Sequence, residues 1–170
     1  MITHSLLKQR LQYDPIKGQF TWNAIPNAVH HQKIWNARFA GTIAGSIDKA
    51  GYTRIKIGGS SEAAHRLAWL WMTGKEPSDE IDHKDGDRSN NRFDNLREAT
   101  RAQNCHNKKA KAGSSEFKGV YFNKQSKKWI ANITINRVRH YLKSWKTEEA
   151  AHAAYREAAE RLHGDFARAA

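Results

Sequence analysis

The chain has 170 residues, of which 39% are hydrophobic and 27% charged, and its formal net charge at pH 7 is +12. This length suits one domain or two small ones, and six Trp and six Phe supply apolar surface for a packed core. A single cysteine excludes a disulfide framework and any zinc site with several thiolates. No apolar run reaches membrane-spanning length and the N-terminus lacks a secretory apolar core, so we expect an intracellular protein.

The first part of the chain predicts short helices and strands in alternation. A short helix is expected over residues 5–12 and a strand over residues 18–22, whereas residues 26–40 fit neither pattern. Residues 52–57, YTRIKI, alternate between apolar and polar side chains, which is typical of a half-buried strand.

A helix is expected next, over residues 62–74. Ser61 is a suitable N-cap and Gly74 suits the turn that ends the helix. Its apolar stripe consists of Ala64, Leu67, Ala68 and Trp71.

The segment Ile81–Asn107, IDHKDGDRSNNRFDNLREATRAQNCHN, concentrates short polar side chains: five Asn, four Asp and two His. Residues 80–84 predict a strand, Asp85-Gly86 a reversal, and residues 91–98 an irregular return that ends in a short strand. The pattern Thr100-x-x-Gln103 is a capping box, so a helix is expected from Arg101 to about Lys109. The prediction is a hairpin followed by a helix.

A hairpin followed by a helix can place a strand residue opposite the first turns of the helix, and Asp82 and Asn104 fit this arrangement. Carboxylate and amide oxygens are ligands that Mg²⁺ prefers. His83, the next residue, titrates near neutral pH and can take a proton from water. An EF-hand does not fit, because Gly86 at loop position 6 would put Ile81 at position 1 and Arg92 at position 12.

The positive charge gathers in one part of the chain. Residues 107–146 contain eleven Lys or Arg and one acid, a net charge of +10, and they also contain Trp and Tyr. This combination favours a polyanion, most plausibly nucleic acid, as the partner. The alternative is a basic surface that only aids solubility.

Residues 107–114, NKKAKAGS, predict a basic linker. Three strands are expected after it, in FKGVYF, KWIANITI and RVRHYLKSW, with Trp129, Ala131, Ile133 and Ile135 sharing one face of the second strand. Thr147 caps a final helix that ends at Gly164. The expected apolar stripe of this helix is Ala151, Tyr155, Ala158 and Leu162.

The spacing Asp82-His83, Asn95, Asn104 resembles the HNH nuclease motif, which has a ββα-metal fold. The segments YDPIKGQFTW, AHRLAWLWMTGKEP and IDHKDGDRSNNRFDNLREATRAQN are also similar to phage and intron-borne HNH homing endonucleases. The resemblance implies that Asp82 and Asn104 bind one divalent metal, Mg²⁺ or Mn²⁺, with no other cofactor. It also implies that His83 is the general base and that Asn95 orients it.

The segment from about Ser115 to Ala167 resembles the plant Apetala-two/ethylene-response-factor (AP2/ERF) DNA-binding domain. The resemblance rests on KGVYFNKQSKKWIANI, RHYLKSW and TEEAAHAAYREAAERLHG. It implies DNA contacts at Lys118, Tyr121, Asn123, Lys128, Asn132, Thr134, Arg139 and Tyr141. Tyr121, Asn123, Thr134 and Tyr141 stand where several plant members have Arg or Trp, so the resemblance does not carry over the target sequence.

The predicted fold class is α+β. The expected parts are an HNH nuclease domain over residues 1–106, with a ββα-metal core at about 80–109, the linker 107–114, and an AP2/ERF-like domain over residues 115–170. The leading hypothesis is a homing-type DNA endonuclease that leaves 5′-phosphate and 3′-hydroxyl ends. The alternatives are a non-catalytic DNA-binding regulator on a nuclease-derived scaffold and a nuclease directed at branched DNA or RNA. Whether the protein is a monomer or a dimer stays open.

Overall fold

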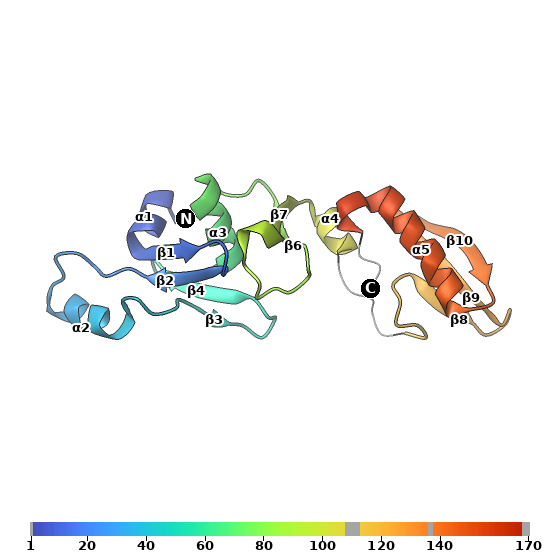
Figure 1. Cartoon of the computed structure of the whole chain (residues 1–170), viewed down its shortest axis with the longest axis horizontal. Helices are drawn as coiled ribbons and strands as arrows, with labels where there is room; N and C mark the ends of the chain where they lie inside the picture. Colours follow the sequence, from blue (N-terminus) through green and yellow to red (C-terminus); the bar gives the residue numbers. More distant parts are fainter. Residues whose placement is uncertain (1, 108–112, 136–137, 168–170) are drawn as a thin grey trace. The chain divides into compact units, whose positions relative to one another are not determined.

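The structure, a computed structural model, describes residues 2–107, 113–135 and 138–167. The chain divides into two compact units, Met1–Ala99 and Thr100–Ala170. Figure 1 shows short helices mixed with small antiparallel sheets in the chain, which confirms the α+β prediction. Most of the predicted linker and the end of the helix expected at Lys109 lie outside the described residues.

The first unit begins with helix α1 (His4–Arg10) and a hairpin of strands β1 (Leu11–Asp14) and β2 (Gln19–Trp22). The Thr3 hydroxyl caps α1 by accepting from the Leu6 amide. The helix ends before the predicted residue 12, because Leu11 already belongs to a strand that pairs with Trp22.

The ambiguous residues 26–40 contain helix α2 (His30–Phe39), which has no buried residue. The Asn36 side chain holds this helix to the preceding loop, because it accepts from the Ile25 amide at 2.8 Å and donates to the Ile25 carbonyl at 3.0 Å. The Trp35 ring meets the edge of Trp22 at a centroid distance of 5.4 Å. An exposed helix of this kind lacks the apolar stripe that sequence patterns detect.

A second small sheet contains β3 (Ser46–Ile47), β4 (Thr53–Ile57) and β5 (Ser60–Ala63), in that order. The strand predicted over residues 52–57 is confirmed, with Ile55 and Ile57 buried. The prediction that Ser61 caps a helix is wrong, since Ser61 lies in β5. Gly58 and Gly59 both have positive φ and form a two-residue hairpin turn, which pairs Ile57 with Ser60.

Helix α3 (Ala64–Thr73) packs on this sheet and ends at Gly74, whose φ of 72° gives the left-handed turn that was predicted. Its buried residues are Ala64, Leu67, Ala68 and Leu70. They join Leu7, Leu11, Phe20 and Ile55 in one core cluster that also contains Ile81 and Leu96. The last two residues anchor the hairpin of β6 (Glu80–His83) and β7 (Leu96–Ala99). A short 3-10 helix, η1 (Phe93–Asn95), precedes β7.

The second unit begins with helix α4 (Arg101–His106), which starts with the predicted capping box of Thr100 and Gln103. A three-stranded antiparallel sheet follows, in the order β10-β9-β8, formed by β8 (Val120–Asn123), β9 (Lys128–Ile135) and β10 (Val138–Trp145). Helix α5 (Glu148–His163) packs on this sheet, and the 3-10 helix η2 (Gly164–Phe166) follows it. The sheet-on-helix prediction is confirmed (Figure 1).

Alanines allow α5 to lie close to the sheet. Ala151, Tyr155, Ala158 and Ala159 are buried against Val120, Ala131 and Ile133. The predicted stripe is wrong at its last member, because Leu162 is 42% exposed and Ala159 takes the buried place. In the described part of the chain, no helix has the length and apolar character needed to cross a bilayer.

Candidate active site

The β6–β7 hairpin positions the two adjacent residues that the sequence singled out. Asp82 and His83 are 3% and 5% exposed. Successive strand residues point to opposite faces, so His83 shares the face of the core residue Ile81 and Asp82 lies on the other face. Asp82 is paired in register with Arg97 and His83 with Leu96. The hairpin therefore buries a carboxylate and an imidazole on adjacent residues of one strand, one on each face.

The Asp82 carboxylate forms an ion pair with Arg97. The Arg97 Nε and Nη2 atoms lie 2.8 Å and 2.7 Å from the same oxygen, Oδ2 of Asp82. The side chain of Arg97 is only 15% exposed and that of Asp82 is 4% exposed. The sequence pattern pointed to Asp82 but did not reveal its ion pair with Arg97, because an arginine among mixed charges carries no distinguishing signal.

The His83 ring is held by a hydrogen bond and by two rings. Its Nε2 lies 3.2 Å from Oδ1 of Asn91. The His65 ring meets it edge-on at a centroid distance of 5.0 Å, and the Tyr52 ring lies at 6.2 Å. Burial lowers the pKa of His83 more than the Asn91 hydrogen bond and the neighbouring aspartates raise it. The imidazole is therefore neutral at pH 7.

The partners of Asn91 fix which nitrogen of His83 carries the proton. Nδ2 of Asn91 donates to the Ser89 carbonyl at 3.0 Å, which can only accept. Oδ1 of Asn91 therefore faces His83 as an acceptor, and Nε2 of His83 is the donor. In the neutral ring the basic lone pair then lies on Nδ1. This is the atom of His83 that can take a proton.

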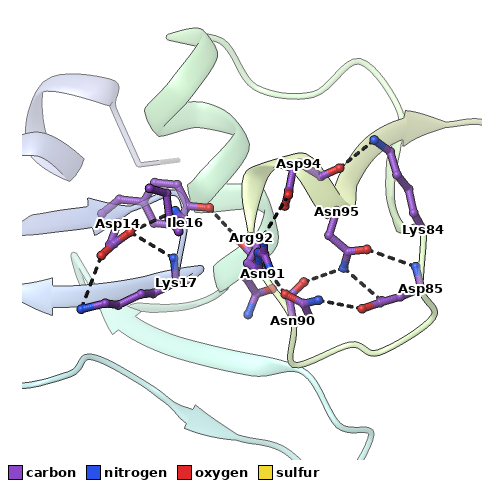
Figure 2. Close-up of polar contacts among 11 residues, drawn as sticks. Asp14, Ile16, Lys17, Lys84, Asp85, Asn90, Asn91, Arg92, Asp94 and Asn95 are labelled. Carbon is purple, nitrogen blue, oxygen red and sulfur yellow. Dashed lines mark hydrogen bonds and ion pairs between the residues drawn. The ribbon is translucent and has the colours of Figure 1, made fainter.

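Asn95 organises the loop that follows His83. Its Oδ1 accepts from the Asp85 amide at 3.1 Å, and its Nδ2 donates to Oδ1 of Asp85 at 3.0 Å and to the Asn90 carbonyl at 2.9 Å (Figure 2). The Lys84 amide also donates to the Asn95 carbonyl at 2.9 Å. These bonds close the loop next to His83, so Asn95 acts on the backbone around the ring, while the side chain hydrogen-bonded to the ring is Asn91.

A brace from the β1–β2 hairpin supports the segment that carries Asn91. The Tyr13 hydroxyl donates to the Asn91 carbonyl at 2.6 Å, and the Phe93 amide donates to the Pro15 carbonyl at 3.2 Å. Gly18, with a φ of 68°, lies so close that a Cβ there would be 2.4 Å from the Arg92 nitrogen. Figure 2 shows the neighbouring turn, in which Asp14 accepts from the amides of Ile16 and Lys17.

Asn104, the other predicted metal ligand, lies on α4 and is half-buried. The Thr100 hydroxyl accepts from the Gln103 amide, and the Asn104 amide donates to the Thr100 carbonyl, so the capping box fixes the first turn that carries Asn104. Because α4 belongs to the second compact unit, the convergence of Asn104 with Asp82 stays a prediction. Among residues 2–107, 113–135 and 138–167 there is no group of three or more His, Cys, Asp and Glu that could hold a metal.

The C-terminal sheet brings most of the predicted DNA contacts to one face. The register pairs Asn123 with Lys128, Asn132 with Tyr141, and Thr134 with Arg139. Strand alternation places them on the face opposite the buried Ala131 and Ile133, which α5 covers. Tyr121 lies on the same face, whereas Lys118 precedes β8. The open face therefore combines lysine, arginine, tyrosine and amide side chains.

Comparison with known proteins places this site in a family. A family model described as HNH endonuclease matches residues 62–106. Over 111 residues the chain is 33% identical to Protein 3.8 of Escherichia phage T7. This match covers 63% of this chain and 91% of that protein. The chain belongs to the HNH endonuclease family.

Two further similarities are more partial. Over 122 residues the chain is 36% identical to a protein of Acanthamoeba polyphaga mimivirus that is named as an HNH endonuclease. The match covers 71% of this chain, and the chain spans 63% of the length of that relative. The solved structure of the HNH homing endonuclease I-HmuI, described as showing DNA binding and cleavage, is 29% identical, with a TM-score of 0.40, and the match covers 58% of this chain and 51% of that one.

Proposed function

We propose that the protein is a metal-dependent DNA endonuclease of the homing type, which hydrolyses phosphodiester bonds to 5′-phosphate and 3′-hydroxyl ends. The observation that carries the proposal is a buried, neutral His83 that follows the buried Asp82 in the same strand, with Nε2 of the ring hydrogen-bonded to Asn91. In this orientation Nδ1 of His83 takes a proton from the attacking water. One such centre cuts one strand, so a monomer is expected to nick.

The resemblance to HNH nucleases implies a divalent metal, and the donor chemistry here fits one. Asp82 offers a carboxylate oxygen and Asn104 an amide oxygen, which are hard ligands of the kind that Mg²⁺ and Mn²⁺ take. Such a site takes one or two protein groups and is completed by water and phosphate oxygens. When bound, the cation supplies charge stabilisation at the scissile phosphate and the leaving oxygen.

The C-terminal unit is proposed to place the nuclease on double-stranded DNA. Its open face carries Lys128, Arg139 and Tyr141, and a β-ribbon can enter the major groove. The resemblance to the AP2/ERF domain and the net charge of +10 over residues 107–146 support this division of labour. Removal of residues 114–170 is expected to weaken DNA affinity more than it slows the chemical step at saturating substrate.

The test of the proposed function is plasmid nicking with Mg²⁺ or Mn²⁺. Without its general base, His83→Ala is expected to nick about 10²–10⁴-fold more slowly than the wild type. His30→Ala, which changes an exposed histidine on α2, is the matched control and is expected to nick at the wild-type rate. Equal nicking by His83→Ala and the wild type would contradict the role of His83.

One observation favours the alternative of a non-catalytic DNA-binding regulator. Arg97 holds the Asp82 carboxylate, which is the group expected to bind the metal. If the wild type binds one duplex sequence tightly and leaves it uncut with either metal, the regulator is the correct function. A single assay with linear duplex, branched DNA and RNA as competing substrates separates the duplex nuclease from nucleases of the other two kinds.

A further inference from the structure

The contact between Arg97 and Asp82 has consequences for the proposed metal site. The two residues face each other across the β6–β7 hairpin, and two guanidinium nitrogens meet one carboxylate oxygen at 2.8 Å and 2.7 Å. Both side chains are largely buried. Arginine keeps its positive charge under all physiological conditions. The Asp82 carboxylate, which is proposed to bind a metal cation, is therefore already paired with the positively charged guanidinium of Arg97.

This pairing has two opposite effects on the site. A buried carboxylate without a partner is strongly unfavourable, so the guanidinium stabilises Asp82 in its place while no metal is bound. A divalent cation that binds the same carboxylate is repelled by the guanidinium a few ångströms away, and this repulsion is strong where water is scarce. Phosphate oxygens relieve the repulsion, because they carry negative charge toward both cations.

We propose that Arg97 is a positioning residue for Asp82 that lowers the metal affinity of the free protein, so that the cation binds tightly only together with the phosphate of the nucleic acid. This inference rests on the proposed function. By thermodynamic reciprocity, nucleic acid then raises metal affinity by the same factor by which metal raises nucleic-acid affinity. The protein without DNA is weakly loaded with metal.

The experiment measures Mn²⁺ binding to the full chain without DNA, from the electron paramagnetic resonance signal of the free ion. Arg97→Gln is expected to lower the Mn²⁺ dissociation constant by roughly tenfold or more, because it removes the repelling charge. Arg97→Lys keeps the charge and is expected to stay near the wild type. Asp82→Asn is expected to abolish binding at this site.

Arg92→Gln is the matched control, because it makes the same change in net charge in the same part of the chain. Arg92 pairs with Asp94, and both of these side chains are well exposed. This variant is expected to bind Mn²⁺ as the wild type does. Equal dissociation constants for Arg92→Gln and Arg97→Gln would overturn the inference.

A second measurement covers the case in which Arg97→Gln does not fold. Removing both charges, in Asp82→Asn with Arg97→Gln, is expected to restore the melting temperature that Arg97→Gln alone loses. A double variant no more stable than Arg97→Gln would overturn the positioning role. Nicking by the wild type tests the proposed function separately. If the wild type nicks DNA but Arg92→Gln and Arg97→Gln have equal Mn²⁺ dissociation constants, only the role of Arg97 is refuted. If the wild type does not nick DNA, the nuclease function is refuted.

Discussion

His65 gives a quantitative prediction about stability at low pH. Its ring lies on α3 next to His83, and its Nδ1 is buried with no hydrogen-bond partner in the described part of the chain. Burial, with smaller contributions from His83 and Arg66, lowers the pKa of His65 to about 3. In the unfolded chain the pKa of a histidine is about 6.5. Between these values the unfolded state binds a proton at His65 that the folded state does not.

The sign and size of the effect follow from this difference. The folded-state pKa is the lower one, so the free energy of unfolding is unaffected well above pH 6.5 and decreases as the pH falls toward 3. The slope approaches about 1.4 kcal/mol per pH unit, which amounts to about 2.5 kcal/mol between pH 7 and pH 4.5. This figure holds for any folded-state pKa well below 4.5.

The assay compares urea unfolding of the wild type and His65→Phe at pH 7, 5.5 and 4.5. Phenylalanine keeps an aromatic ring against Tyr52 and His83 and does not titrate. The variant is expected to lose about 2.5 kcal/mol less stability than the wild type over this range. Contributions from titrating groups that do not contact His65 are common to both proteins and cancel. Equal losses in the two proteins would refute the buried, neutral state of His65.

Three further predictions concern the brace and the basic sheet face. Gly18→Ala is expected to lower the free energy of unfolding by about 2 kcal/mol or more and to reduce nicking. The control is Gly41→Ala, since Gly41 also has positive φ but an added Cβ would meet nothing within 4 Å, and it is expected to lower the free energy of unfolding by only about 1 kcal/mol. Equal losses in urea unfolding would refute the clash with Arg92. Tyr13→Phe removes the buried hydrogen bond to the Asn91 carbonyl and is expected to lose about 1–2 kcal/mol by the same assay. Arg139→Gln is expected to reduce the salt dependence of DNA binding by about 0.9 in log–log slope if Arg139 contacts a phosphate, and an unchanged slope would place Arg139 off the DNA.

The elements that sequence patterns predicted correctly are those with a strong local signal. Strand β4 alternates strictly, α3 ends at a glycine, and the capping box sets the first turn of α4. The errors occur where a short-range pattern competes with pairing. Ser61 is a good N-cap by residue type, but the Gly58-Gly59 turn places it in a strand that pairs with β4. Leu11 was predicted to be helical, but it pairs with Trp22 in the first hairpin.

The candidate site was predictable only in part. Asp82 and His83 were predicted as site residues because their spacing to later asparagines is distinctive. The contacts that Asn91 and Arg97 make were not predicted, since one residue stands in a run of small polar residues and the other among mixed charges. Only the fold brings them to His83 and Asp82. Asn95 was predicted to orient the imidazole, and its hydrogen bonds run to Asp85 and Asn90. The hydrogen bond between Tyr13 and Asn91 could not be predicted, because the two residues are far apart in the sequence.

The hydrogen bond from Tyr13 to Asn91 means that the recognisable nuclease segment is not self-sufficient. The match to the family model begins at residue 62, yet the support for the loop after His83 comes from the first twenty residues of the chain. A minimal fragment cut at the limits of the motif would retain the chemical groups and lose the scaffold that orders them. Transplanting this segment onto another protein would therefore require the N-terminal hairpin to be moved with it.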